Sequence, residues 1–418
     1  MRRVLALAVL ATAAILALRD GDSRLAAGDA GARLASTPAG PLLGFVHDRE
    51  GSGGTLRLFA PGTLRALDRG AVRLEGFQPD AWAVSPDERR VAVAVRGTRL
   101  KVIQRVPLRA HGGTVDIGSV EPPWAMAWVR AQALLALAPG RGSAPAAITE
   151  VDPIARRILA VHELSGTLVS LATGRRTIVA LLGSFGRIGP ARLAVATGDG
   201  AVREWPLPAV AVGQEGERYA IPAVALDETG RRAFVVAATS ALRVVEIDLI
   251  TGRATTHDLR RGGGPLAALR DLLDPVAHAK GADGTRRSAR WLGDGRLAVS
   301  GERQSTAGGS FTIYALGLEL VDVVGWRATF VDGWNQGDIT AAAGRLLVGQ
   351  RGELVAYDHD GRERYRRPKP QSAHPVPARG RLYLRHPGRG SIEVVDARTG
   401  ATERVLPATK RLPRFLER

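Results

Sequence analysis

The chain has 418 residues, contains no cysteine and carries a formal net charge of +17. The lack of thiols excludes disulfides, a lipidated N-terminal cysteine, covalent haem attachment and thiolate metal sites. Apolar residues make up 45% of the sequence, so a full core can form, and the 50 glycines and 24 prolines are typical of a chain rich in turns. Because the positive charge is almost entirely arginine, in a chain rich in alanine and glycine, it indicates either a generally basic surface or a dedicated anion-binding surface.

Residues 1–32 are predicted to be an export signal or an N-terminal anchor with a tether. Met1-Arg2-Arg3 precedes the apolar run Val4–Leu18. This pattern is typical of an export signal, and the run is shorter than the roughly 20 residues that span a membrane. No small-residue cleavage site follows closely, since Ala30-Gly31-Ala32 is distant, so cleavage and retention as a membrane tether both stay open. Either alternative predicts an extracytoplasmic protein that is secreted, periplasmic or anchored facing outward.

The rest of the chain repeats one unit, which is clearest at residues 223–259. It holds four apolar runs of strand length, at 223–226, 233–238, 242–248 and 253–259. The first and last pairs of runs are joined by short polar turns that contain Gly230 and Gly252, and glycine accepts the positive φ of such turns.

Both halves of this unit recur along the chain. Copies of the first hairpin begin at Trp82, Leu168, Trp291, Ala343 and Ala378, and copies of the second begin at Thr149, Val355 and Ile392. A period of about 40 residues is what a four-stranded propeller blade needs. The sequence therefore predicts an all-β propeller of four-stranded antiparallel blades over residues 33–409, followed by a C-terminal tail at 410–418.

The two turns also resemble those of the bacterial YVTN-type and WD-repeat-like β-propellers, whose blades carry an "SPDG-R" turn and an "ID-TG" turn. Here the matching residues are 85–89 (SPDER) and 247–252 (IDLITG). The resemblance covers residues 33–409 and implies the propeller fold. It implies no single function, because propellers include binding scaffolds, enzymes and electron-transfer subunits.

Eight units can be counted in chain order. This count predicts eight blades, or seven if the first unit only completes the last blade. The units span residues 33–75, 81–118, 124–164, 166–207, 223–259, 288–324, 339–367 and 374–406.

The long connections are expected to share one face of the propeller. Strands A to D of a blade run from hub to rim, so the A–B and C–D turns lie on one face and the B–C loops and D–A crossings on the other. The long connections, at 139–145, 183–190, 301–310 and 260–287, are all of the second kind. The last contains Pro265–Leu273, which is apolar at helical spacing and predicts one short amphipathic helix, either a plug on the propeller or a lid or docking helix.

The sequence assigns no catalytic residue, cofactor or metal ligand, because no hydrolase elbow, phosphate-binding loop or zinc-protease pattern is present. We therefore expect a non-enzymatic scaffold that binds a partner protein or an anionic ligand on the face with the long loops. If the ligand is a small anion, the candidate residues are Arg141, Arg187 and Arg303 from the B–C loops, together with Trp334.

Two alternatives stay open. YVTN-like propellers are similar to the large subunits of periplasmic amine dehydrogenases and to the sugar lactonases, which implies an enzyme or an enzyme subunit. The basic segment Arg362–Lys369 is a second candidate for anion binding. For an exported protein, anionic lipid or cell-wall polymer is a better partner for it than nucleic acid, which we do not expect.

Overall fold

The computed structural model describes residues 41–48, 53–76, 78–119, 121–130, 132–140, 142–174, 176–259, 261–262, 283–305, 312–333, 339–350, 352–368, 376–378, 380–386, 391–407 and 413–416. All elements in this part of the chain are strands, and none of it is a helix that could cross a membrane. The expected export signal at 1–32 and the expected helix at Pro265–Leu273 lie outside the described residues.

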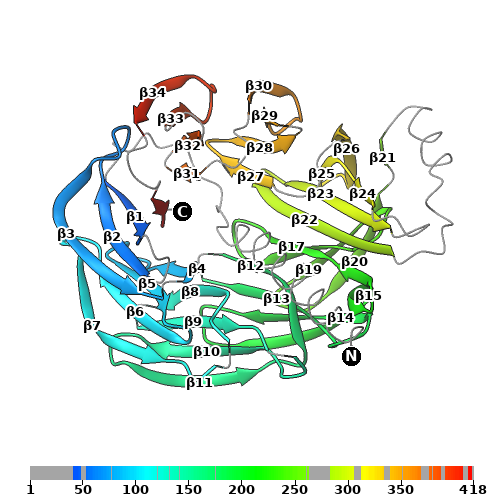
Figure 1. Cartoon of the computed structure of the whole chain (residues 1–418). Coiled ribbons are helices and arrows are strands. Elements are labelled where there is room, and N and C mark those ends of the chain that lie inside the picture. Colours follow the sequence, from blue (N-terminus) through cyan, green and yellow to red (C-terminus); the bar gives the residue numbers. More distant parts are fainter. Residues whose placement is uncertain are drawn as a thin grey trace, which may run out of the picture.

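The strands form twisted antiparallel sheets arranged around a common axis, which is the architecture of a β-propeller (Figure 1). Six sheets are separate and four-stranded. They consist of β1 (Leu42–His47), β2 (Gly53–Phe59) and β3 (Ala66–Glu75) with β35 (Arg414–Phe415); β4 (Gln78–Val84), β5 (Arg90–Val95), β6 (Arg99–Gln104) and β7 (Arg109–Asp116); β8 (Ala125–Arg130), β9 (Ala133–Ala138), β10 (Ala147–Asp152) and β11 (Arg157–Glu163); β17 (Ala223–Leu226), β18 (Arg232–Val236), β19 (Leu242–Asp248) and β20 (Ala254–Leu259); β27 (Ile339–Ala342), β28 (Arg345–Gln350), β29 (Glu353–Tyr357) and β30 (Glu363–Pro368); and β31 (Val376–Ala378), β32 (Arg381–His386), β33 (Ser391–Asp396) and β34 (Thr402–Pro407).

The remaining strands belong to one sheet of eleven strands, so the predicted count of eight separate blades, or of seven, is wrong. Units four and six do not stand alone but are joined within this sheet. Its strands are β12 (Thr167–Thr173), β13 (Ile178–Gly183), β14 (Gly189–Ala196), β15 (Val202–Glu215), β16 (Arg218–Ile221), β22 (Asp283–Gly293), β23 (Arg296–Ser305), β25 (Leu318–Asp322), β26 (Arg327–Asp332) and β21 (Arg261–Gly262), with β24 (Thr312–Ala315) paired to β23.

The joining strands explain the difference in count. β15 continues for 14 residues, well past the end of an ordinary blade strand, and turns at Gly216 (φ +60°) into β16. β16 then pairs in parallel with β22, which comes much later in the chain. A count based on hairpins cannot detect this connection, because the paired strands are remote in sequence and a short strand carries little periodic signal.

The hydrophobic core lies between neighbouring sheets rather than in one central mass. Leu56 and Val72 of the first sheet, for example, pack with Val91 and Ile103 of the second, and all four are almost completely buried. Successive strand residues point to opposite faces, so each sheet can bury one face against each neighbour. The architecture therefore depends on every sheet having two neighbours.

Aspartates at equivalent positions of two sheets stabilise the same kind of turn. The Asp248 carboxylate accepts hydrogen bonds from the backbone N–H groups of Ile250 (2.9 Å) and Thr251 (2.8 Å). Asp396 accepts the corresponding bonds from Arg398 (2.9 Å) and Thr399 (2.7 Å). These carboxylates stabilise the turn between the third and fourth strands of their sheets.

The end of the chain completes the first sheet. β35 pairs with β1 through Gly44–Phe415 and Phe45–Arg414, and Figure 1 shows it (dark red) beside β1 (blue). The expected domain boundary placed residues 410–418 in a tail outside the propeller, whereas the structure places Arg414–Phe415 within it. The first unit lacked a clear first strand in its own sequence, and β35 supplies that strand.

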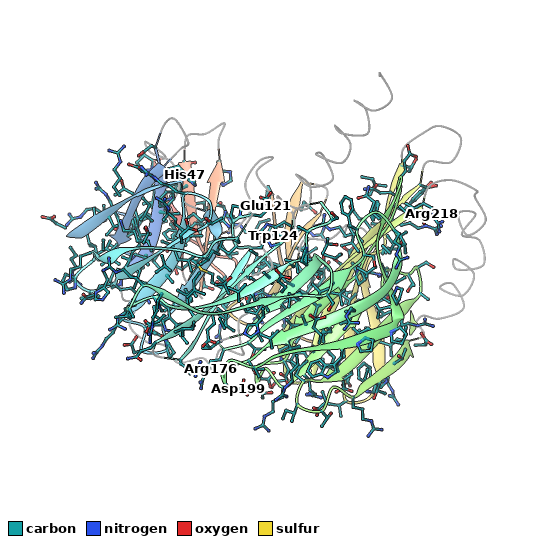
Figure 2. All side chains as sticks on the ribbon, turned by 90° about the horizontal axis from the view of Figure 1, so that it is seen from below. His47, Glu121, Trp124, Arg176, Asp199 and Arg218 are labelled. Carbon is teal, nitrogen blue, oxygen red and sulfur yellow. The ribbon has the colours of Figure 1, made fainter. Side chains whose placement is uncertain are left out.

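The two faces of the propeller carry different connections. Figure 2 shows Arg176 and Asp199, from an A–B turn and a C–D turn, at its lower side. His47, Trp124 and Arg218, which lie on B–C connections, D–A crossings and the β15–β16 hairpin, are at its upper side. We call this upper side the decorated face.

A stacked pair of rings joins the sheet of β17–β20 to the eleven-stranded sheet. The His257 and Trp326 rings are nearly parallel, at an angle of 5°, with centroids 3.3 Å apart. The side chain of His257 is 18% exposed, and its Nε2 lies 3.7 Å from Glu246 Oε2. Burial lowers the pKa of His257 below 6.5, and the nearby Glu246 opposes this shift without cancelling it.

We predict that Phe415→Ala destabilises the whole propeller. Phe415 is 7% exposed and packs against Phe59 and Tyr383, which belong to the first and the last four-stranded sheets. Truncating a buried phenylalanine costs about 3–5 kcal/mol, which urea denaturation followed by circular dichroism would measure. Val405→Ala, on an exposed outer strand, is the control and should change the free energy of unfolding by less than about 0.5 kcal/mol. Equal effects of the two variants would contradict this role of Phe415.

We also predict that His257 makes the stability depend on pH. Because folding lowers its pKa, the neutral ring is favoured in the folded state. The stabilisation is complete above pH 6.5 and is lost as the pH falls through the lower folded-state pKa. Urea midpoints measured between pH 8 and pH 5 should therefore fall more steeply for the natural protein than for His257→Gln. Parallel curves would show that His257 does not titrate in this contact.

Candidate functional site

The described residues form a basic groove on the decorated face, between the first and second sheets. The groove has a volume of about 310 Å³, and four of its eight lining residues are cationic. Glu75 is its single acidic lining residue, and the others are Leu74, Val95 and Thr114. The cationic residues are Arg73 from β3, Arg96 from the β5–β6 turn, and Arg99 and Lys101 from β6.

Strand alternation places Lys101 in this groove. On β6, Leu100 and Val102 pack toward the third sheet, whereas Ile103 packs toward the first. Lys101 shares the face of Ile103, and its Cα partners are Val93 and Thr114. Lys101 is thus half-buried and faces the neighbouring sheet. Ile103, two residues further along the same face of β6, is the kind of apolar residue expected at such a position.

The backbone of Arg96 is held in an uncommon conformation at the edge of the groove. Its φ is +44°, in the left-handed region that Gly, Asn and Asp adopt more readily. Its backbone N–H donates to the carbonyl oxygens of Glu75 (3.2 Å) and Gly76 (2.9 Å), which come from the first sheet. A side chain at Gly76 would approach the Arg96 nitrogen to 2.9 Å, so glycine is needed there. Two sheets therefore cooperate to place the Arg96 side chain.

Ion pairs neutralise the groove only in part. Arg96 pairs with Glu75. Arg73 lies 3.7 Å from Asp48, and Arg73 is 77% exposed, so this contact is weak. Within the described part of the chain Lys101 forms no ion pair.

Arg99 is also only loosely paired. It lies 3.7 Å from the Asp116 carboxylate. The pKa of Asp116 is lowered first by the backbone N–H of Gly118 and then by the Thr98 hydroxyl, and Arg99 contributes less than either. Asp116 is therefore already stabilised by other donors, and the Arg99 guanidinium keeps capacity for a further anion.

The basic segment Arg362–Lys369 is different, because three of its four arginines are already paired. Arg364 lies 2.5 Å from Asp358, and Arg366 lies 2.5 Å from Glu353. Arg367 pairs with Glu393. These contacts connect strands within and between the last two four-stranded sheets, so the charge of this segment is used internally, and the groove offers a better anion site.

The structure describes two of the four residues expected from the sequence, and these two lie in different parts of the eleven-stranded sheet, one in a turn and one within a strand. Arg187 is exposed in the β13–β14 turn, next to Gly213 of β15. Arg303 lies within β23, opposite Thr285 and Tyr314, and not in a loop as expected, because β23 extends to Ser305. From β15 to β23 there are three strand spacings, about 14 Å in total. Arg141 and Trp334 lie outside the described residues.

The groove could not be predicted from the sequence, because its residues come from two units and from no long loop. The available signal was Lys101, a charged residue at a strand position that alternation assigns to a sheet interface. Among the residues that the structure describes, no group of three or more His, Cys, Asp and Glu side chains could hold a metal ion.

No protein-family model and no curated protein match the chain. Solved structures do match. The dihydro-heme d1 dehydrogenase NirN in complex with DHE has a TM-score of 0.54 and 12% identity, covering 92% of this chain and 76% of that one. Apo AztD from Citrobacter koseri has a TM-score of 0.51 and 11% identity, covering 89% and 96%. At these identities the likeness concerns the fold: the chain is a β-propeller, and no family model supports the resemblance to the YVTN group.

We predict that Arg96→Asn leaves the propeller as stable as before or more stable. Asparagine adopts the left-handed conformation more easily, which offsets the loss of the exposed pair with Glu75. The free energy of unfolding, measured by urea denaturation, should change by less than about 1 kcal/mol, and we expect it to rise. Arg90→Asn, also an arginine on the second sheet but with ordinary φ, is the control for loss of charge alone. A large loss confined to Arg96→Asn would show that its side chain is structural.

Proposed function

We propose that this protein is an exported, non-enzymatic propeller that binds a small polyanionic ligand in the basic groove. The observation that carries the proposal is the lining of the groove, where four cationic side chains from two sheets accompany one carboxylate. The extracytoplasmic location rests on residues 1–32 of the sequence alone.

The charges of the groove favour a ligand with more than one negative charge. Arg73 and Arg99 have long, exposed contacts with their carboxylates, so an incoming oxyanion competes well for them. Guanidinium groups bind phosphate and carboxylate oxygens through two parallel hydrogen bonds, and Lys101 adds a compact charge. Together they fit a phosphate monoester, a pyrophosphate or a tricarboxylate.

The size and exposure of the groove set the kind of binding. A volume of about 310 Å³ lies at the lower end of ligand pockets, so the ligand is small. Leu74 and Val95 give an apolar base that lowers the local dielectric constant, whereas Arg73 at the rim is open to water. Binding is therefore expected to weaken strongly with added salt.

The alternative function, an enzyme or subunit of the amine dehydrogenase or lactonase type, has less support in the geometry. The single carboxylate of the groove, Glu75, pairs with Arg96 and is not free to act as a base. NirN is named as a dehydrogenase, and an identity of 12% does not transfer that activity.

We predict that Lys101→Glu abolishes anion binding. Isothermal titration with inorganic pyrophosphate and with citrate, at low ionic strength, should show binding to the natural protein. Losing one charge-assisted contact costs about 1.5–3 kcal/mol, so Lys101→Ala should weaken binding about 10- to 100-fold, and charge reversal should weaken it further. Lys101→Arg should keep most of the affinity.

Two comparisons keep this test specific. Arg218→Glu, at the tip of the β15–β16 hairpin, makes the same change in net charge far from the groove and should leave binding intact. The triple charge reversal of Arg141, Arg187 and Arg303 tests the site expected from the sequence. Loss of binding in the triple variant, with binding retained in Lys101→Glu, would move the ligand to the site expected from the sequence and overturn the groove.

A further inference from the structure

β11, the outer strand of the third sheet, is more apolar than the other outer strands. Ile158 and Leu159 are each 42% exposed, and Val161 is 55% exposed. The outer strands β3, β7, β20 and β30 expose no large apolar side chain in the part of the chain that the structure describes, and β26 and β34 expose one each. Three exposed large apolar residues within four positions of one edge strand are unusual, because such an edge promotes association.

The outer edge of β11 is available for pairing. In its sheet, whose strand order is β11-β10-β9-β8, β11 is terminal and pairs only with β10 among the described strands. A bulge opposite Glu150–Val151 adds Leu159 to the strand, so that Ile158 and Leu159 are both exposed side by side. Within the described residues, the edge therefore offers an apolar surface with no further strand paired to it.

The sequence of β11 is complementary to its own reverse. The strand reads Arg157-Ile-Leu-Ala160-Val-His-Glu163. If two copies lie antiparallel with a two-fold axis at Ala160, each Arg157 faces Glu163 of the second copy. Leu159 then faces Val161, and alanine faces alanine at the axis. Opposite charges and apolar pairs across antiparallel strands are both stabilising.

We propose that the protein forms a two-fold symmetric dimer through edge-to-edge packing of β11. A second copy is the partner because a two-fold axis makes one patch meet itself. The two Arg157–Glu163 pairs and the Leu159–Val161 pairs of this strand meet that condition, whereas Ile158 faces His162. Arg157 and Glu163 are both exposed and engaged in no ion pair within the described residues, so their charges are open to a partner. The two arginine–glutamate pairs set the antiparallel register.

The dimer is expected to depend on concentration. A strand of seven residues supplies less than the about 800 Å² per partner of a standard interface. Sedimentation velocity of the full chain, over a concentration series at low and moderate salt, should therefore show a reversible monomer–dimer equilibrium.

Charge reversal tests the register. Arg157→Glu and Glu163→Arg, each alone, place two pairs of like charges in the interface, and each should raise the dissociation constant about tenfold or more. The double variant Arg157→Glu with Glu163→Arg restores both pairs in the opposite sense and should restore the dimer. Val161→Lys should abolish it.

Matched controls separate this from general effects of charge. Arg404→Glu, on the exposed outer strand β34, makes the same charge change and should leave the equilibrium unaltered. Circular dichroism should show all variants folded, because the substituted side chains are exposed. A monomer at every concentration, or single reversals without effect, or a double variant that does not recover the dimer, would each overturn the proposal.

Discussion

The pairing of β35 with β1 is the contact on which the rest of the structure depends. Each sheet buries one face against the sheet before it and one against the sheet after it, so an open row would leave two apolar faces uncovered. The last residues of the chain prevent this, because Phe415 lies against both Phe59 and Tyr383 and so connects the first and last four-stranded sheets. Once β35 closes the ring, the outer strands and connections can vary without loss of the fold. The residues that distinguish this protein chemically therefore lie in those outer strands and connections.

The basic groove follows from the shape of this ring. Sheets that radiate from an axis are in close contact near the hub and diverge toward the rim, and Leu74 and Val95 lie where the apolar packing between the first two sheets meets the groove. Beyond that point the facing positions are filled by Arg99 and Lys101. The net charge of +17 does not reveal this site, because elsewhere arginines such as Arg366 are neutralised by their own carboxylates. What distinguishes the groove is the arrangement of charges that the fold leaves incompletely paired.

Much of the fold could be predicted from the sequence, because each unit carries its own strand and turn signals. Asp248 and Asp396 occupy equivalent positions, and the structure shows the same hydrogen bonds at both. The count of sheets and the closing strand could not be predicted, since β16–β22 and β35–β1 join short segments that are remote in sequence. The groove was missed for the same reason: Arg73 and Lys101 become neighbours only when two units pack. Long loops are easily recognised in a sequence, whereas a single lysine at a strand position that faces a neighbouring sheet is not.

The eleven-stranded sheet shows that the decorated face is a fixed part of the scaffold. Arg287 of β22 and Glu319 of β25 have fully buried side chains, with their charged groups 3.9 Å apart. Arg287 also donates hydrogen bonds to the carbonyl oxygens of Thr239 (2.6 Å) and Ser240 (3.2 Å), which belong to the neighbouring sheet. The hydrogen bonds connect the two sheets, and breaking the buried pair within the eleven-stranded sheet would leave an uncompensated charge. The extension made by β15, β16 and β22 is thus anchored in the core.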